Sequence, residues 1–281
     1  MEDIHIYQTP PPFDPEWLEY EKTSGILSRP VITDLKARQV SFSQRRKEQN
    51  KILLSGRDKY LAEGIHIRNI TVEGKDPQDI YPITVRVYNP IPSSAEPKNP
   101  LLEGQPLVIY YHGGGLRVGD LDWSSSGGQL AATVAQAKVG ATDYERIHGL
   151  LLRCPVTSEP TTIPERFRRL HTSMSPAFNS SLCSFPGVVT ESNRARTLPL
   201  ESKDLSEQPR TWMQVTTNDI YYSDGICYAK ALKDSAVEVK VDVVKGWPHT
   251  FWLDAPLLER AAQADNDMIA GLKWLFDSDL Q

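Results

Sequence analysis

The sequence predicts an α/β protein whose mostly parallel sheet is covered by helices. Short apolar runs typical of strands alternate with stretches of helical periodicity over the second half of the chain. Such alternation predicts parallel strands joined by helices. A glycine triplet, an aspartate and a histidine each follow one of these runs, where functional residues gather in parallel sheets. The chain of 281 residues is long enough for one large domain or two small ones.

The first 56 residues predict polar helices that cover another part of the protein. Three consecutive prolines at positions 10–12 make a rigid entry. Asp14 can then cap a helix that has Pro15 in its first turn. A second stretch, residues 34–54, is charged and helical in character but only weakly amphipathic.

Several strands are expected after this segment. Residues 65–72 and 83–88 largely alternate apolar and polar side chains, which predicts two half-exposed strands. Residues 107–111 are continuously apolar, β-branched or aromatic and predict a buried strand. The elements expected after them are a turn at 124–128, a helix at 129–136, a strand at 147–156, a strand at 212–216, a helix at 224–233, a strand at 237–244 and a helix at 256–276.

Composition narrows the class of protein. The net charge is −5 and lysines and arginines are scattered, which argues against nucleic acid as the main partner. No apolar run approaches the length of a membrane-spanning helix. The three cysteines have no metal-ligand spacing and do not suggest a disulfide framework. Cys154 lies inside an apolar run and is expected to be a small core residue. With no secretory signal visible at the N-terminus, we expect a cytoplasmic protein.

His112 is followed by the glycines Gly113, Gly114 and Gly115, directly after the predicted strand at 107–111. Consecutive glycines leave backbone N–H groups uncovered, so a ligand can approach them closely. An ester hydrolase needs such donors where charge develops on the carbonyl oxygen, and losing one costs roughly a hundredfold in rate. The simpler alternative is a glycine-rich turn after a core strand.

Three further residues complete a possible catalytic set in the order Ser125, Asp219 and His249. A hydroxyl is a poor nucleophile at neutral pH, so a histidine must accept its proton and a carboxylate must orient that histidine. Glycine-rich donors, serine, aspartate and histidine in this order are typical of α/β-hydrolases. Ser125 could instead be an ordinary loop serine and Asp219 a helix cap, whereas His249 is harder to explain structurally.

The chain resembles the hormone-sensitive-lipase-like branch of the α/β-hydrolases. The matching stretches are residues 112–115 with Gly119 and Asp120, and residues 125–132, 219–225 and 248–251. Residues 14–18 also resemble the start of fungal secondary-metabolite pathway esterases, such as those acting on versiconal hemiacetal acetate. The resemblance implies an N-terminal helical cap, residues 1–56, and an α/β-hydrolase core with a mostly parallel sheet, residues 57–281.

The resemblance further implies a serine carboxylesterase that works through an acyl-enzyme without a metal or organic cofactor. Ser125 would be the nucleophile, His249 the general base and Asp219 the carboxylate that orients it. The implied oxyanion hole consists of the backbone N–H groups of Gly113, Gly114 and Ser126. The expected substrates are short-chain or acetyl esters of a small molecule in a secondary-metabolite pathway.

Two departures from the family pattern affect this expectation. The family has glycine two residues before its nucleophile, where this chain has Trp123, whose indole would clash in a tight turn. Ser126 satisfies that steric rule better, while the register of the following helix favours Ser125. Only nine residues separate Gly115 from Ser125. A single crossover between parallel strands needs roughly a dozen. The sheet should therefore lack two central strands, through a mispredicted intron, a decayed gene or a rearrangement.

A second hypothesis is therefore a catalytically inactive relative that binds a small molecule or is a truncated remnant. The plant gibberellin receptor, which resembles this branch, binds its ligand without hydrolysing it. A structural or nucleic-acid-binding protein has no support in charge or motif. The sequence leaves the oligomeric state open.

Overall fold

A computed structural model describes residues 6–30, 32–76, 79–91, 107–111, 125–138, 147–158, 163–171 and 198–277. The chain divides into two compact units. The larger contains residues 1–39 and 110–281, and the smaller contains residues 40–109. The division into a cap, residues 1–56, and a core, residues 57–281, stays a prediction.

The larger unit is built on a parallel sheet of three described strands in the order β3-β4-β5. These are β3 (Gly149–Arg153), β4 (Arg210–Asn218) and β5 (Val239–Pro248). Strand β4 is buried along nearly its whole length, as expected of a strand covered on both faces. The prediction of an α/β protein with a parallel sheet is confirmed.

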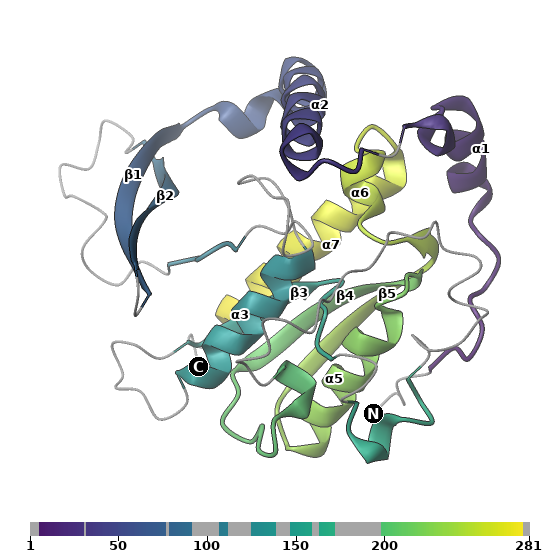
Figure 1. The fold of residues 1–281 in the computed structure, drawn as a ribbon, viewed down its shortest axis with the longest axis vertical. Helices are drawn as coiled ribbons and strands as arrows, with labels where there is room; N and C mark the ends of the chain where they lie inside the picture. The colour runs from purple at the N-terminus through teal and green to yellow at the C-terminus, as the bar shows by residue number, and fades with distance from the viewer. Residues whose placement is uncertain are drawn as a thin grey trace. The chain divides into compact units, whose positions relative to one another are not determined.

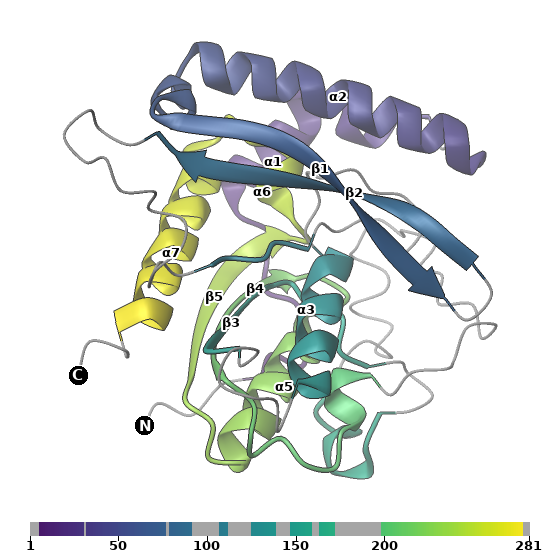
Figure 2. The same ribbon diagram turned by 90° about the vertical axis from the view of Figure 1, so that its left-hand side faces the viewer.

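Helices cover both faces of this sheet (Figures 1 and 2). Helices α3 (Ser125–Ala137) and α5 (Tyr222–Asp234) lie on one face, and α7 (Glu259–Phe276) lies on the other. On β4, Val215 faces α5 so closely that a Cβ atom at Gly225 would lie 2.5 Å from its Cγ1 atom. Trp212, also on β4, points to the opposite face of the sheet and packs against Gly271 of α7.

Two apolar clusters form the described core of this unit. The larger includes side chains from α3, β3, β4 and α5, among them Leu152, Met213 and Ile226. The second contains Trp17, Cys154, Val244, Trp247, Phe251, Trp252, Ala255, Ala261 and Ala264. It brings together residues of helices α1 (Pro15–Thr23), α6 (Phe251–Asp254) and α7 with residues near the ends of β3 and β5. Residues far apart in the sequence therefore pack together around these strand ends.

Helix α1 begins as the sequence predicts. The Asp14 side chain accepts a hydrogen bond from the Glu16 N–H at 2.9 Å, which confirms it as the N-cap. Trp17 then meets Trp247 edge-on, with ring centroids 6.1 Å apart. The Tyr20 hydroxyl donates to the Asp254 carbonyl at 2.6 Å. These contacts attach α1 to the segment that follows β5.

In the smaller unit, β1 (Ile65–Asp76) and β2 (Asp79–Pro90) form an antiparallel pair. This confirms the two strands expected from alternation. Helix α2 (Leu35–Ser55) spans the division between the units and confirms the second predicted helix.

The expectation of a buried strand at residues 107–111 is wrong. The structure assigns no strand there, and Leu107, Val108, Ile109 and Tyr110 expose 82%, 54%, 66% and 62% of their surface. A strand needs a neighbouring backbone for its hydrogen bonds, and none of the described strands pairs with this run. Local apolar character alone does not create a strand.

Several predicted boundaries also differ from the structure, those of β3 and α3 among them. Strand β3 ends at Arg153, two residues before Pro155, because proline has no N–H to give to the sheet. Helix α3 begins at Ser125 rather than at residue 129, so most of the expected turn at residues 124–128 is helical.

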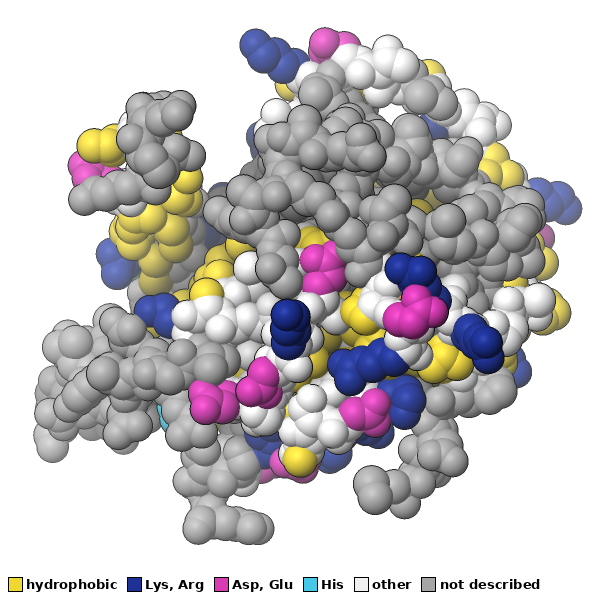
Figure 3. Space-filling model, turned by 60° about the horizontal axis from the view of Figure 1, so that its bottom comes forward, with side chains coloured by type: hydrophobic (Ala, Val, Ile, Leu, Met, Phe, Trp, Pro, Cys, Tyr) yellow, Lys and Arg dark blue, Asp and Glu magenta, His cyan; other side chains and the backbone are white. Residues whose placement is uncertain are grey.

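Charged side chains on the described surface are mixed in sign. The face drawn in Figure 3 intersperses lysines and arginines with aspartates and glutamates, without a continuous basic area among the residues it colours. No helix in the described part of the chain has the length and apolar character needed to cross a membrane.

Candidate active site

Asp219 directly follows β4 and is almost completely buried, at 1% exposure. Its Oδ1 atom accepts a 2.8 Å hydrogen bond from the Tyr221 N–H, which turns the chain into α5. Its Oδ2 atom lies 2.6 Å from the Nδ1 atom of His249. Both carboxylate oxygens are thus engaged, so the group has a fixed direction.

His249 directly follows β5, and the left-handed Thr250 (φ 49°) begins the turn into α6. The imidazole keeps 23% of its side-chain surface exposed, so a molecule from solvent can reach it. Burial of the ring opposes its charged form, but the Asp219 carboxylate, with a smaller contribution from Cys154, outweighs this and raises the pKa of His249 to about 10. The pair can therefore hold the positive charge that the ring gains when it accepts a proton.

Tyr221 contacts both members of this pair. Its ring meets the imidazole of His249 edge-on, with centroids 5.4 Å apart and planes 65° apart. Burial, together with the nearby Asp219 charge, raises the pKa of Tyr221 to about 12 and keeps the phenol neutral. This residue therefore positions the pair through its backbone N–H and its ring. No pattern in the sequence indicated this role.

The N-terminal segment holds the ends of both strands that carry the pair. The Asn218 side chain donates to the Pro11 carbonyl at 2.8 Å, and the Asp14 N–H donates to the Gly246 carbonyl at 2.9 Å. The Gly246 N–H in turn donates to the Thr217 hydroxyl at 2.8 Å. Gly246 needs its positive φ of 83°, and a Cβ atom there would lie 3.1 Å from the Pro12 carbonyl oxygen.

The predicted nucleophile Ser125 is the first residue of α3, and its side chain lies outside the described residues. The first turn of this helix packs against the segment that follows β3. A Cβ atom at Gly128 would lie 3.2 Å from Cβ of Pro155. Nothing is described of the Ser126 side chain, and Gly113 and Gly114 also lie outside the described residues. The roles of all four residues stay predictions.

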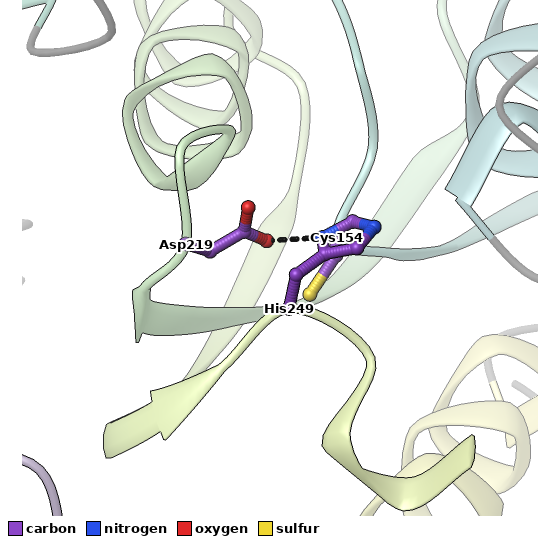
Figure 4. Close-up of side chains that lie close together, drawn as sticks. All are labelled: Cys154, Asp219 and His249. Carbon is purple, nitrogen blue, oxygen red and sulfur yellow. Dashed lines mark hydrogen bonds and ion pairs between the residues drawn. The ribbon is translucent and has the colours of Figure 1, made fainter. Parts of the chain in front are cut away.

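Cys154, expected to be a small core residue, lies beside the Asp219–His249 pair. It follows β3 with a left-handed φ of 43°, is 1% exposed, and its Sγ atom lies 3.5 Å from the Thr216 hydroxyl. Donor atoms of Cys154, Asp219 and His249 all lie within 4.8 Å of one another (Figure 4). Cys154 lies inside the strand predicted at 147–156, so the position directly after a strand, which singles out Asp219 and His249, gave no signal for it.

A second serine, histidine and aspartate cluster is fully buried. The Asp224 Oδ1 atom accepts from the N–H groups of Thr157 and Ser158, at 3.0 and 2.9 Å, and from the Ser158 hydroxyl at 3.0 Å. His171 lies 3.3 Å from the other Asp224 oxygen and 3.2 Å from the Ser223 hydroxyl. The His171 and Asp224 side chains are only 1% and 3% exposed, so no substrate reaches them. This cluster ties the segment after β3 to the start of α5.

Comparison with known structures supports the fold. Over its full length the chain matches vibralactone cyclase over that protein's full length, with a TM-score of 0.79 and 18% identity. An esterase of Pyrobaculum calidifontis matches with a TM-score of 0.63 and 19% identity, covering 94% of this chain and 99% of that one. Fungal esterases from Rhizomucor miehei match with a TM-score of 0.61 and 16% identity, covering 95% of this chain and 99% of theirs.

Sequence comparison gives shorter matches. An AB hydrolase superfamily protein of Schizosaccharomyces pombe is 36% identical over 77 residues, which is 27% of this chain and 22% of that protein. An FAD-linked oxidoreductase of Aspergillus terreus is 25% identical over 160 residues, which is 54% of this chain and 20% of that protein. The chain thus spans about a fifth of the length of these curated relatives.

A family model described as alpha/beta hydrolase fold matches residues 124–253. This range contains Ser125, Asp219 and His249. It also contains all three strands of the parallel sheet. Together with the shared fold of the solved structures, the match shows that this chain has the α/β-hydrolase fold.

Proposed function

We propose that the chain is a serine carboxylesterase that hydrolyses short-chain or acetyl esters of a small molecule in a secondary-metabolite pathway. The observation that carries this proposal is the 2.6 Å contact between His249 and the buried Asp219, at the ends of neighbouring parallel strands. Functional groups of α/β sheets gather at this edge. Esterases among the structures that share the fold support the reaction type, and the resemblance of residues 14–18 supports the pathway.

In the proposed first half-reaction, the Ser125 oxygen attacks the ester carbonyl carbon while the His249 Nε2 atom accepts the hydroxyl proton. Asp219 holds the Nδ1–H and stabilises the imidazolium. Backbone N–H groups bind the oxyanion of the tetrahedral intermediate. These donors belong to Gly113, Gly114 and Ser126.

The first half-reaction ends when the intermediate collapses and the alcohol leaves with the proton from His249, which makes the acyl-serine. The second half-reaction removes this acyl group. A water molecule then attacks the acyl-serine and gives one proton to the same imidazole. Collapse of the second intermediate releases the acid and returns that proton to the Ser125 oxygen. Protons and electrons balance without a cofactor.

The test is hydrolysis of p-nitrophenyl acetate by the purified full chain and by the variants Ser125→Ala, Ser126→Ala and His249→Ala. We expect Ser125→Ala and His249→Ala to lose at least about a thousandfold in kcat, because members of a triad act as a unit. The exposed His66 of β1 is the matched control, and His66→Ala should retain the wild-type rate. Unchanged activity in both Ser125→Ala and His249→Ala would contradict the assignment.

Rapid quenching followed by mass spectrometry separates the two candidate serines. An acetyl group should appear on wild type and on Ser126→Ala but not on Ser125→Ala. The opposite pattern would make Ser126 the nucleophile and preserve the proposed reaction.

The second candidate function is binding of a small molecule without turnover. The observations favouring it are Trp123 at a position that needs a small residue, and the short spacing between Gly115 and Ser125. A folded wild-type chain that shows neither hydrolysis nor an acetyl adduct would favour this alternative.

A further inference from the structure

Three different metal-binding side chains meet at the carboxyl end of the parallel sheet. Cys154 follows β3, Asp219 follows β4 and His249 follows β5. Their donor atoms, a thiol sulfur, a carboxylate oxygen and an imidazole nitrogen, all lie within 4.8 Å of one another. Figure 4 shows the sulfur beside the imidazole ring and the carboxylate pointing at its edge.

Two features of the Cys154 backbone bring its side chain to this position, and a core residue would need neither of them. Its N–H donates to the Gln214 carbonyl at 2.8 Å, so Cys154 stays paired with β4 after β3 has ended. Its φ of 43° lies in the left-handed region, which is uncommon for a residue with a side chain. The thiol sulfur consequently lies near Thr216 and the Asp219–His249 pair.

This set of donors fits zinc better than magnesium. Zinc binds cysteine sulfur, histidine nitrogen and carboxylate oxygen, whereas magnesium prefers oxygen ligands. Tetrahedral zinc bonded to such atoms places neighbouring ligands about 3.5 Å apart. The most widely spaced of these donors, up to 4.8 Å apart, must therefore approach by about 1 Å, whereas Asp219 Oδ2 and His249 Nδ1, now 2.6 Å apart, must separate by about the same amount. Side-chain rotation can supply that movement, since the imidazole retains 23% exposure. The exposed side of His249 also gives an ion access.

We propose that Cys154, Asp219 and His249 together bind a zinc ion reversibly, and that the bound ion inhibits hydrolysis. Binding displaces the thiol proton to solvent and places the metal on a nitrogen of His249, so the ring can no longer accept the serine proton. The inhibitory part rests on the proposed esterase function, whereas zinc binding itself does not.

Cobalt(II) is a spectroscopic probe of this site, because a thiolate ligand gives a sulfur-to-cobalt charge-transfer absorption in the near ultraviolet. We expect the reduced full-length chain to bind one cobalt ion with this absorption, and zinc to abolish it. Cys154→Ser and Cys154→Ala should both lack the absorption. Near-ultraviolet circular dichroism checks that the variants are folded.

Cys227 supplies the matched control. It lies on α5, is fully buried, and belongs to no group of potential metal ligands found in the described part of the chain. Cys227→Ala should therefore keep the cobalt absorption. Absorption that persists in folded Cys154→Ser, or the absence of cobalt binding by folded wild type, would overturn the proposal.

The inhibitory part is measured by zinc titration of p-nitrophenyl acetate hydrolysis, with each variant compared with its own rate in the absence of zinc. Cys154→Ser should raise the zinc concentration for half-inhibition at least about tenfold, by analogy with the loss of groups that support metal ligands. Magnesium should not inhibit. Equal zinc sensitivity of wild type and Cys154→Ser would contradict this proposal alone. A chain that hydrolyses nothing contradicts the proposed function, while the cobalt spectrum still decides on binding.

Discussion

At the scale of single residues, the contact between Asp219 and His249 has two electrostatic consequences. The carboxylate orients the imidazole through a 2.6 Å hydrogen bond, and its charge stabilises the protonated ring. Only the neutral ring can accept a proton from the serine. In the proposed reaction, the charge that assists the transition state therefore also sets the pH range in which the chain can react.

The pH profile of kcat/KM tests the two opposing effects on the pKa of His249, burial of the ring and the charge of Asp219. Burial lowers the pKa of His249, the carboxylate raises it more, and the result of about 10 predicts that kcat/KM rises with pH into the alkaline range. Asp219→Asn removes the charge, so the rise should move to lower pH. The maximal rate should also fall by about ten-thousandfold, because an amide in place of the carboxylate favours the wrong tautomer of the imidazole. A profile whose midpoint stays in place in Asp219→Asn would contradict the assigned cause.

Cys154 shows what residue-level sequence reasoning could not reach. Its surroundings in the sequence are apolar, and the three cysteines lack metal-ligand spacing, so a core role was the natural interpretation. The proximity to Asp219 and His249 depends on the order of three strands and on a left-handed backbone angle. Neither the strand order nor this backbone angle can be inferred from the residues next to Cys154 in the sequence.

At the scale of elements, local signals worked where the cause of structure is local. The aspartate and proline at residues 14 and 15 predicted the start of α1, because capping involves only adjacent residues. The apolar run at 107–111 predicted a strand that the structure lacks, because a strand depends on a distant partner. The strands carrying Asp219 and His249 were predicted, since each is long and has neighbours to pair with.

Gly246 tests whether the N-terminal segment positions the strand that carries His249. In Gly246→Ala, the methyl group meets Pro12 and Asp14 at 3.0 to 3.1 Å, in addition to the strain of a positive φ. We expect a loss of more than about 1 kcal/mol in unfolding free energy and a lower kcat. Denaturant unfolding and hydrolysis measurements check the two effects.

Gly64 is the matched control for backbone strain. It has a similar φ of 69°, but an added Cβ atom would meet nothing within 4 Å. Gly64→Ala should show only the strain of about 1 kcal/mol, with an unchanged kcat. Equal effects of the two substitutions on kcat would show that the N-terminal contact does not support the site.

At the scale of the whole molecule, exposed apolar residues at positions 107–110 affect solubility. Contiguous exposed apolar side chains favour self-association. Val108→Lys should therefore reduce light scattering at high protein concentration, while changing the free energy of unfolding by no more than about 0.5 kcal/mol. Val215 of β4 is 1% exposed, so Val215→Lys should instead unfold the domain. Unchanged scattering in Val108→Lys would contradict a role of this run in association.

The sequence-based prediction is confirmed for the general architecture. Asp219 and His249 follow strands as expected, while their catalytic roles stay predictions. The parallel sheet and the α/β-hydrolase fold are confirmed. Residues 112–115 and the side chain of Ser125 lie outside the described residues, so the complete catalytic set stays a prediction. The loss of two central strands also stays a prediction, which sequencing of the transcript across codons 115–125 can test.

The hydrogen bond from Asn218 to Pro11 also bears on the order of events during synthesis. The two residues are 207 positions apart, so Pro11 leaves the ribosome long before the strand that it contacts exists. The N-terminal segment must therefore wait, without this partner, until β4 and then β5 have been translated. Assembly of the Asp219–His249 pair in its final surroundings can only be a late event. A slowly emerging or misplaced C-terminal half would leave these early residues available to chaperones.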